Sequence, residues 1–148
     1  MKPTKQQQKP IGFFLAGIRT EQFALLSQSY KEDEPVQVNA EVKYGASIED
    51  RMIVVYARCN FTHSEVPFIT IEVSQQYIVE PESFTTLIND SERTFTIPKD
   101  LAAHLVLLTV CTARGVLHAR LENSAFSRFF IPTINIASLV QEPIVLNY

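Results

Sequence analysis

The feature that most constrains the fold is a strict alternation of apolar and polar residues from Val36 to Tyr44. Val36, Val38, Ala40, Val42 and Tyr44 are apolar, and the four residues between them are polar. Because successive side chains of a strand point to opposite faces, this pattern predicts a strand with one buried face and one solvated face. A Gly-Ala-Ser link at residues 45–47 then interrupts it.

Two further runs of the same kind follow closely. Met52 to Phe61 carries its apolar side chains at every second position, and so does Ile69 to Tyr77. A short polar link, His63-Ser64-Glu65, joins these two runs. Parallel strands need a long crossover, so links this short predict antiparallel neighbours.

A fourth strand is expected near the N-terminus. Residues 11–26 are apolar on both faces, which favours a strand that is buried at least in part on both sides, either continuous or broken near Gly17. The stretch 27–35 contains Tyr30 and a charged run, and we expect a surface loop there. The region expected to form the sheet is thus residues 11–77, in four strands.

After a short β-like run at residues 94–97, the pattern changes to that of a helix. Pro98 opens a stretch to residue 121 whose apolar positions lie on two helical faces. Gly115 within it costs about 1 kcal/mol relative to alanine, which indicates the close approach of another backbone. Residues 133–140 predict a short second helix before a segment broken at Pro143.

Length and composition favour a single globular unit. The 148 residues suit one domain, with residues 1–10 expected as a loose tail and 141–148 as a C-terminal tail. The net charge of −3 gives no general attraction to nucleic acid or to an anionic membrane. The basic N-terminus lacks the order of charged and apolar residues expected of a signal peptide, and no apolar run is expected to reach the roughly 20 residues of a membrane span.

No motif of catalysis, cofactor binding or metal binding was found. Four glycines are too few for a phosphate-binding loop, and Cys59 and Cys111 are expected as reduced thiols. His63, His104 and His118 are expected to be isolated, since the last two lie roughly 21 Å apart along the helix. The chain is therefore not expected to be an enzyme, to need a cofactor or to bind a metal ion.

The chain has more apolar surface than one sheet and one helix bury. The helix is apolar on two sides, the first strand on two faces, and Phe126, Phe129 and Phe130 follow the helix. For these phenylalanines, packing in the core is an alternative to exposure. The surplus predicts contact with another chain or with a ligand, and self-association is the simplest form of it.

In order and spacing, the chain resembles the SecB family of protein-export chaperones. The residues that carry the resemblance are the strand sequence from Phe68 to Ile78, the Arg114-Gly115 pair in the long helix, and the segment Ile131 to Leu139 with its Pro-x-x-Asn pattern. The likeness covers roughly residues 12–140. It implies an α+β fold: a four-stranded antiparallel sheet followed by a long helix and a short C-terminal helix.

The resemblance also implies a function and a site. It implies a cytoplasmic, ATP-independent holdase that works in protein export as a homotetramer, a dimer of dimers, and that binds non-native polypeptides in apolar grooves without nucleotide or metal. Mapped onto this chain, the polypeptide-binding residues are Tyr30, Val36, Phe129, Phe130, Ile134, Ile136 and Leu139. Acidic residues that match the family's docking surface for the SecA motor are Glu72 and Glu21.

Two alternatives remain open from the sequence. A dedicated chaperone for one partner, such as an antitoxin, shares the fold without the broad client range. A small-ligand binder or enzyme on an α+β scaffold needs an enclosed pocket, with Tyr56, Arg58, His104 or His118 as its polar groups.

Overall fold

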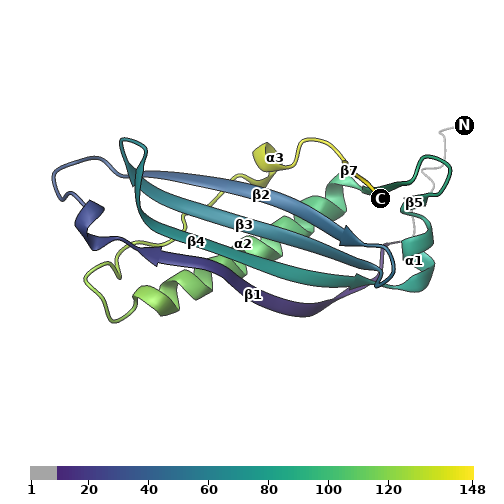
Figure 1. Cartoon of the computed structure of the whole chain (residues 1–148), viewed down its shortest axis with the longest axis horizontal. Helices are drawn as coiled ribbons and strands as arrows, with labels where there is room; N and C mark the ends of the chain where they lie inside the picture. Colours follow the sequence, from purple (N-terminus) through teal and green to yellow (C-terminus); the bar gives the residue numbers. More distant parts are fainter. Residues whose placement is uncertain (1–9) are drawn as a thin grey trace, which may run out of the picture.

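A computed structural model describes residues 10–148, so the predicted tail at residues 1–9 lies outside the described residues. Four long strands form one antiparallel sheet in the order β1-β4-β3-β2. They are β1 (Phe13–Leu25), β2 (Gln37–Ser47), β3 (Met52–His63) and β4 (Val66–Val79). Helix α2 (Lys99–Leu121) runs along one face of this sheet, here called the inner face (Figure 1). The predicted α+β architecture is confirmed.

Strands β2, β3 and β4 form where the alternation predicts them. β2 is longer than expected, because it continues through Gly45 and Ala46 to Ser47 in unbroken register with β3. β3 and β4 are joined by a two-residue turn in which Ser64 and Glu65 both have positive φ, 47° and 71°. That is the backbone of the type I′ hairpin turn, which matches the twist of the strands.

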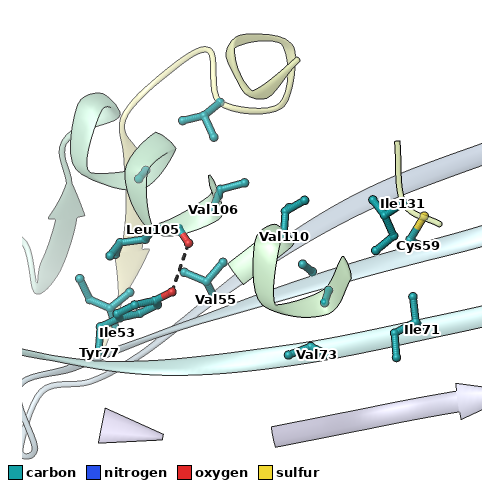
Figure 2. Packing of buried hydrophobic residues seen from close by; sticks show 14 of the residues in the cluster. Ile53, Val55, Cys59, Ile71, Val73, Tyr77, Leu105, Val106, Val110 and Ile131 are labelled. Atoms are coloured by element: carbon teal, nitrogen blue, oxygen red, sulfur yellow. Dashed lines mark hydrogen bonds between the residues drawn. The ribbon is translucent and has the colours of Figure 1, made fainter. Parts of the chain in front are cut away.

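The core lies between the inner face and α2. Alternate residues of β3 and β4 contribute Ile53, Val55, Ile71 and Val73, and α2 contributes side chains such as Leu105, Val106 and Val110 (Figure 2). All of these are almost fully buried. One helix therefore covers the middle strands of the sheet, while β1 and β2 remain the sheet's two edges.

A polar network links the sheet to the helix within this core. The Tyr77 hydroxyl donates to Gln75 Oε1 at 2.5 Å and lies 2.9 Å from Thr109 Oγ1. The backbone oxygen of Leu105 lies 3.3 Å from the same hydroxyl (Figure 2). Gln75 Nε2 in turn donates to Thr112 Oγ1. Because buried polar groups are costly unless paired, this network fixes the position of α2 along β4.

The apolar length of α2 differs from the sequence expectation. Lys99–Leu121 is as long and apolar as a membrane-spanning helix, although no such segment was expected. A buried core helix has the same properties. Since nine of its residues are buried, the packing against the sheet accounts for the apolar composition.

Two expectations about close packing are wrong within this chain. β1 was expected to be buried at least in part on both faces, but it is an edge strand with much of its length exposed, including Leu15 (49%) and Ile18 (56%). Gly115 was expected at a close backbone approach, yet a Cβ there would meet nothing within 4 Å. The expectation for β1 came from apolar composition and that for Gly115 from the cost of glycine in a helix, and neither reveals which neighbour covers a surface.

Several short elements outside the four long strands and α2 were not expected. Helix α1 (Pro81–Thr85) and strand β5 (Ile88–Asn89) follow β4, and η1 (Ser27–Ser29) follows β1. β6 (Thr94–Ile97), which was predicted, is the middle strand of a small sheet β5-β6-β7. The expected C-terminal tail at residues 141–148 instead contains β7 (Ile144–Asn147), and α3 (Ile136–Leu139) is shorter than the predicted helix.

Candidate functional site

Aromatic side chains from three parts of the chain meet at one end of the sheet. Tyr30 comes from the β1–β2 connection, and its ring lies 5.2 to 5.8 Å from the rings of Phe68, Phe126 and Phe129. Rings at these distances attract each other as well as excluding water. The members of this aromatic cluster are Tyr30, Phe61, His63, Phe68, Phe126 and Phe129.

His63 attaches the β1–β2 connection to this cluster. The imidazole is buried and stacks on Phe68 at 4.7 Å. The Lys31 backbone N–H donates to Nε2 at 3.1 Å, and Nδ1 lies 3.0 Å from the Pro35 carbonyl oxygen. The two contacts together require the neutral tautomer with its proton on Nδ1, which donates to Pro35.

Arg128 holds the segment after α2 against the same cluster. Its guanidinium donates to the Tyr30 hydroxyl at 2.5 Å and lies 4.7 Å from the centre of the Phe129 ring. A second nitrogen donates to the Ala125 carbonyl oxygen. The aromatic cluster is thus closed by its own chain, since Tyr30 and Phe129 contact each other and are only partly exposed.

A narrow apolar crevice, here the β2 crevice, runs between β2, α2 and the segment 131–139. Its walls are formed mainly by small and aliphatic side chains: Ala40, Val42, Ala57, Cys59, Val110, Ala113, Ile131, Ile134 and Leu139. The free volume is only about 10 Å³, which is at the lower limit for a single water molecule. In this conformation the crevice holds no large side chain.

Arg114 positions the outer wall of the β2 crevice. From α2, its Nε donates to the Ile131 carbonyl oxygen at 2.7 Å and another nitrogen donates to the Pro132 carbonyl oxygen at 2.8 Å. Burial raises the pKa of the nearby Cys59 thiol to about 12, and the charge of Arg114 opposes that rise. Cys59 is therefore a neutral, apolar part of the wall.

The predicted polypeptide-binding residues fall into four groups. Tyr30 and Phe129 belong to the aromatic cluster, whereas Ile134 and Leu139 line the β2 crevice. Ile136 is partly buried at the start of α3. The others are the most accessible: Val36 just before β2, and Phe130, 61% exposed, beside the aromatic cluster's Phe129.

The predicted docking residues lie together on the outer face of the sheet, away from α2. Glu72 pairs with Arg58 at 3.7 Å and its side chain is only 12% exposed. Glu21 accepts a hydrogen bond from Ser74 Oγ at 2.7 Å. Glu21 is therefore hydrogen-bonded to the sheet, whereas the buried Oε2 of Glu72 has only the ion pair with Arg58 and no hydrogen-bond partner among residues 10–148.

The polar groups expected for a small-ligand pocket do not converge. Tyr56 and Arg58 alternate with buried inner-face residues and so point to the outer face, whereas His104 and His118 are exposed on α2. The sheet lies between the two pairs. Within residues 10–148, no three or more His, Cys, Asp or Glu side chains are grouped as a metal site, and Cys59 and Cys111 are free thiols.

The fold of this chain is similar to that of a solved structure. No protein-family model and no curated protein matches the chain. Among solved structures, the SecB-like chaperone Rv1957 of Mycobacterium tuberculosis, in complex with a ChAD peptide from the Rv1956 HigA1 antitoxin, matches with a TM-score of 0.52. The fold is SecB-like. The match covers 83% of this chain and 91% of the other at 12% identity, so it is a likeness of fold.

Sequence reasoning missed the residues that hold the site together. His63 was treated as isolated, because the residues it bonds, Lys31 and Pro35, lie about 30 positions upstream in a loop without periodicity. Arg128 had no signal at all, since a single arginine after a helix is usually solvated. Arg114 carried part of the resemblance, but its two carbonyl partners follow only from the path of the segment after α2.

Proposed function

We propose that this protein is an ATP-independent holdase that binds unfolded polypeptides along the β2 edge of its sheet. The observation that supports it most is the placement of the β2 crevice beside a strand whose second edge is unpaired within residues 10–148. An extended chain offers backbone groups to such an edge and apolar side chains to the adjacent walls. Burial worth about 25 cal/mol per Å² requires no particular sequence.

Self-association belongs to the same proposal. Leu15 and Ile18 on β1 and Leu107 and Leu108 on α2 leave apolar side chains in solvent on the helix-bearing side of the molecule. Surfaces of this kind are usually covered in the assembled protein. We assign them to contacts between copies in a cytoplasmic homotetramer built as a dimer of dimers, and the open space at Gly115 gives another helix room to approach.

The direct test is suppression of aggregation. At a near-stoichiometric ratio of tetramer to a chemically unfolded test enzyme diluted into buffer, without ATP, the protein is expected to abolish most of the light scattering. Undiminished scattering at a fivefold excess contradicts the proposal. Because holding acts by mass action on the unfolded state, the effect must depend on the concentration of the chaperone.

A dedicated chaperone for one partner is the second candidate. The small free volume of the β2 crevice favours it, because a tight crevice discriminates between side chains more strongly than a wide one. The neighbour Rv1957 was solved with an antitoxin peptide. Purification of the tagged protein from its native lysate separates the two: one stoichiometric companion supports the dedicated role, and many substoichiometric ones support the holdase.

A role in export additionally requires docking to the SecA motor. The outer-face carboxylates Glu72 and Glu21 are the residues proposed for it, and their pairing with Arg58 and Ser74 limits the charge they present. If docking occurs there, E21K is expected to weaken binding to purified SecA, while the aggregation assay stays unchanged. Equal binding of the wild type and E21K contradicts this assignment.

A further inference from the structure

A wider opening than the β2 crevice lies at the opposite end of β2 from the aromatic cluster. It is a cavity of about 190 Å³, open to solvent and lined by Gly45, Ala46, Ile48, Phe95, Leu146, Asn147 and Tyr148. An engineered cavity of roughly 150 Å³ accommodates benzene, so this one has room for an aromatic or leucine side chain. The β2 crevice, at about 10 Å³, does not.

Two free strand edges flank this β2–β7 cavity. Gly45 and Ala46 belong to β2, the last strand of the large sheet, and Leu146 and Asn147 belong to β7, the last strand of the small one. In the described part of the chain, β2 pairs only with β3 and β7 only with β6. An extended polypeptide with one large apolar side chain fits such a site, because its backbone can pair with a free strand edge while the side chain enters the apolar cavity.

The cavity continues the β2 crevice along the same strand. Ala40 and Val42 line the crevice and Ala46 lines the cavity, so the same side of β2 faces both. Between them lies Tyr44, whose hydroxyl is buried without a hydrogen-bond partner among residues 10–148. A buried unpaired hydroxyl is costly, and a polar group of a chain lying along β2 would satisfy it.

We propose that the β2–β7 cavity is the anchor for one large apolar side chain of the unfolded polypeptide, whose extended backbone lies along the edge of β2. This inference rests on the proposed function and refines it. It moves the strongest contact away from Tyr30 and Phe129, which are already occupied with each other, to the junction with the C-terminal strand. It also defines the preferred segment as one in which apolar residues alternate with polar ones.

The test compares two phenylalanine substitutions on β2. Ala46→Phe fills the cavity from its exposed rim, and Asn39→Phe adds the same ring to the opposite, exposed face of the strand. Binding of a fluorescein-labelled, carboxymethylated unfolded protein is measured by anisotropy. Ala46→Phe is expected to weaken binding at least tenfold, and Asn39→Phe less than twofold. Circular dichroism establishes that each variant is folded.

A second measurement tests whether the bound polypeptide covers the cavity, without a substitution that fills it. In a Cys111→Ser background, Ala46→Cys is alkylated with N-ethylmaleimide in the presence and absence of the saturating unfolded protein, with Asn39→Cys as the control. The rate at position 46 is expected to fall at least fivefold and the rate at position 39 to stay unchanged.

The outcomes separate this inference from the function on which it rests. The cavity anchor is overturned if Ala46→Phe binds the unfolded protein as tightly as the wild type does and if the unfolded protein does not slow alkylation at position 46. That result leaves the holdase function intact. Absence of any wild-type binding overturns the holdase and, with it, the anchor.

Discussion

The guanidinium of Arg128 donates a hydrogen bond to the Tyr30 hydroxyl and lies 5.3 Å from the centre of the same ring. The two residues are 98 positions apart, and their contact joins the β1–β2 connection to the segment that follows α2. These are two of the segments that the resemblance assigns to polypeptide binding. The contact therefore holds these two segments against each other.

Arg128→Ala is expected to loosen the aromatic cluster with only a small loss of stability. A charged hydrogen bond and a cation–π contact at an exposed site together contribute about 1 kcal/mol. For a chain of this length that lowers the melting temperature by roughly 2 to 4 °C, with a weaker near-ultraviolet circular dichroism signal from the aromatic cluster. Lys31→Ala, which removes only the exposed ion pair with Glu34, is the control and should change neither. An Arg128→Ala variant that behaves like wild type contradicts the proposed bridge.

The turn between β3 and β4 offers a stabilising substitution. Glu65 has a φ of 71°, which lies in the left-handed region of backbone conformation. This conformation destabilises a residue with a Cβ by roughly 1 kcal/mol, whereas glycine adopts it at almost no cost. Glu65→Gly is expected to raise the melting temperature by roughly 2 to 4 °C at fixed protein concentration. Glu49→Gly, in a turn where φ is not positive, should stabilise nothing. A lower melting temperature for Glu65→Gly would show that the strain at this turn is not relieved by glycine.

Stability is expected to fall at alkaline pH through Cys59. Burial raises the pKa of its thiol from 9.0 to about 12, so between these values the folded chain keeps a proton that the unfolded chain loses. Stability is then fully present below pH 9 and decreases by up to about 1.4 kcal/mol per pH unit above it. Urea unfolding at several pH values from 8 to 10 measures this slope.

Cys59→Ala isolates the contribution of the thiol. The variant should be less stable at every pH, because it loses buried volume, but its stability should change less between pH 9 and pH 10 than that of the wild type. The pKa of the Tyr77 hydroxyl is also raised by burial, so its effect begins at higher pH in both proteins. Equal slopes in the two proteins would assign the alkaline loss to another group.

The exposed apolar side chains of β1 are expected to lie in the contact between copies of the chain. Ile18→Glu puts a charge into the apolar surface on the helix-bearing side, and multi-angle light scattering should show the mass falling from that of a tetramer to that of a smaller species. Arg19→Glu, at the next position along β1, is the control and should leave the mass unchanged. A wild-type mass of 16.8 kDa would contradict self-association altogether.

Strand and helix types could be predicted from the sequence because they depend on local periodicity. The alternation at residues 36–44 and the proline before residue 99 both mark elements found in the structure. The exposure of Ile18 could not be predicted, since an apolar strand at a sheet edge and one in its centre look alike. The same holds for β7: four residues after Pro143 are too few to distinguish a tail from a strand before their partner β6 is known.

The candidate site was only partly predictable for a related reason. Ile134 and Leu139 were assigned to the helix side of a groove by the resemblance alone, and the structure places both in the wall of the β2 crevice. Tyr30 and Phe129 were expected to face a client, yet they face each other. Whether two aromatic side chains bind a partner or one another is decided by tertiary contacts such as those of His63 and Arg128, which no spacing encodes.

Holdase activity is tested most sharply by the affinity of the full-length protein for one polypeptide in its folded and unfolded states. A disulfide-bonded test protein is labelled and used either folded or reduced and carboxymethylated, and binding is followed by fluorescence anisotropy without nucleotide. If the protein is a holdase, the unfolded form is expected to bind with micromolar or tighter affinity and the folded form not at all. Equal binding of both forms, or no binding of the unfolded one, would contradict holdase activity.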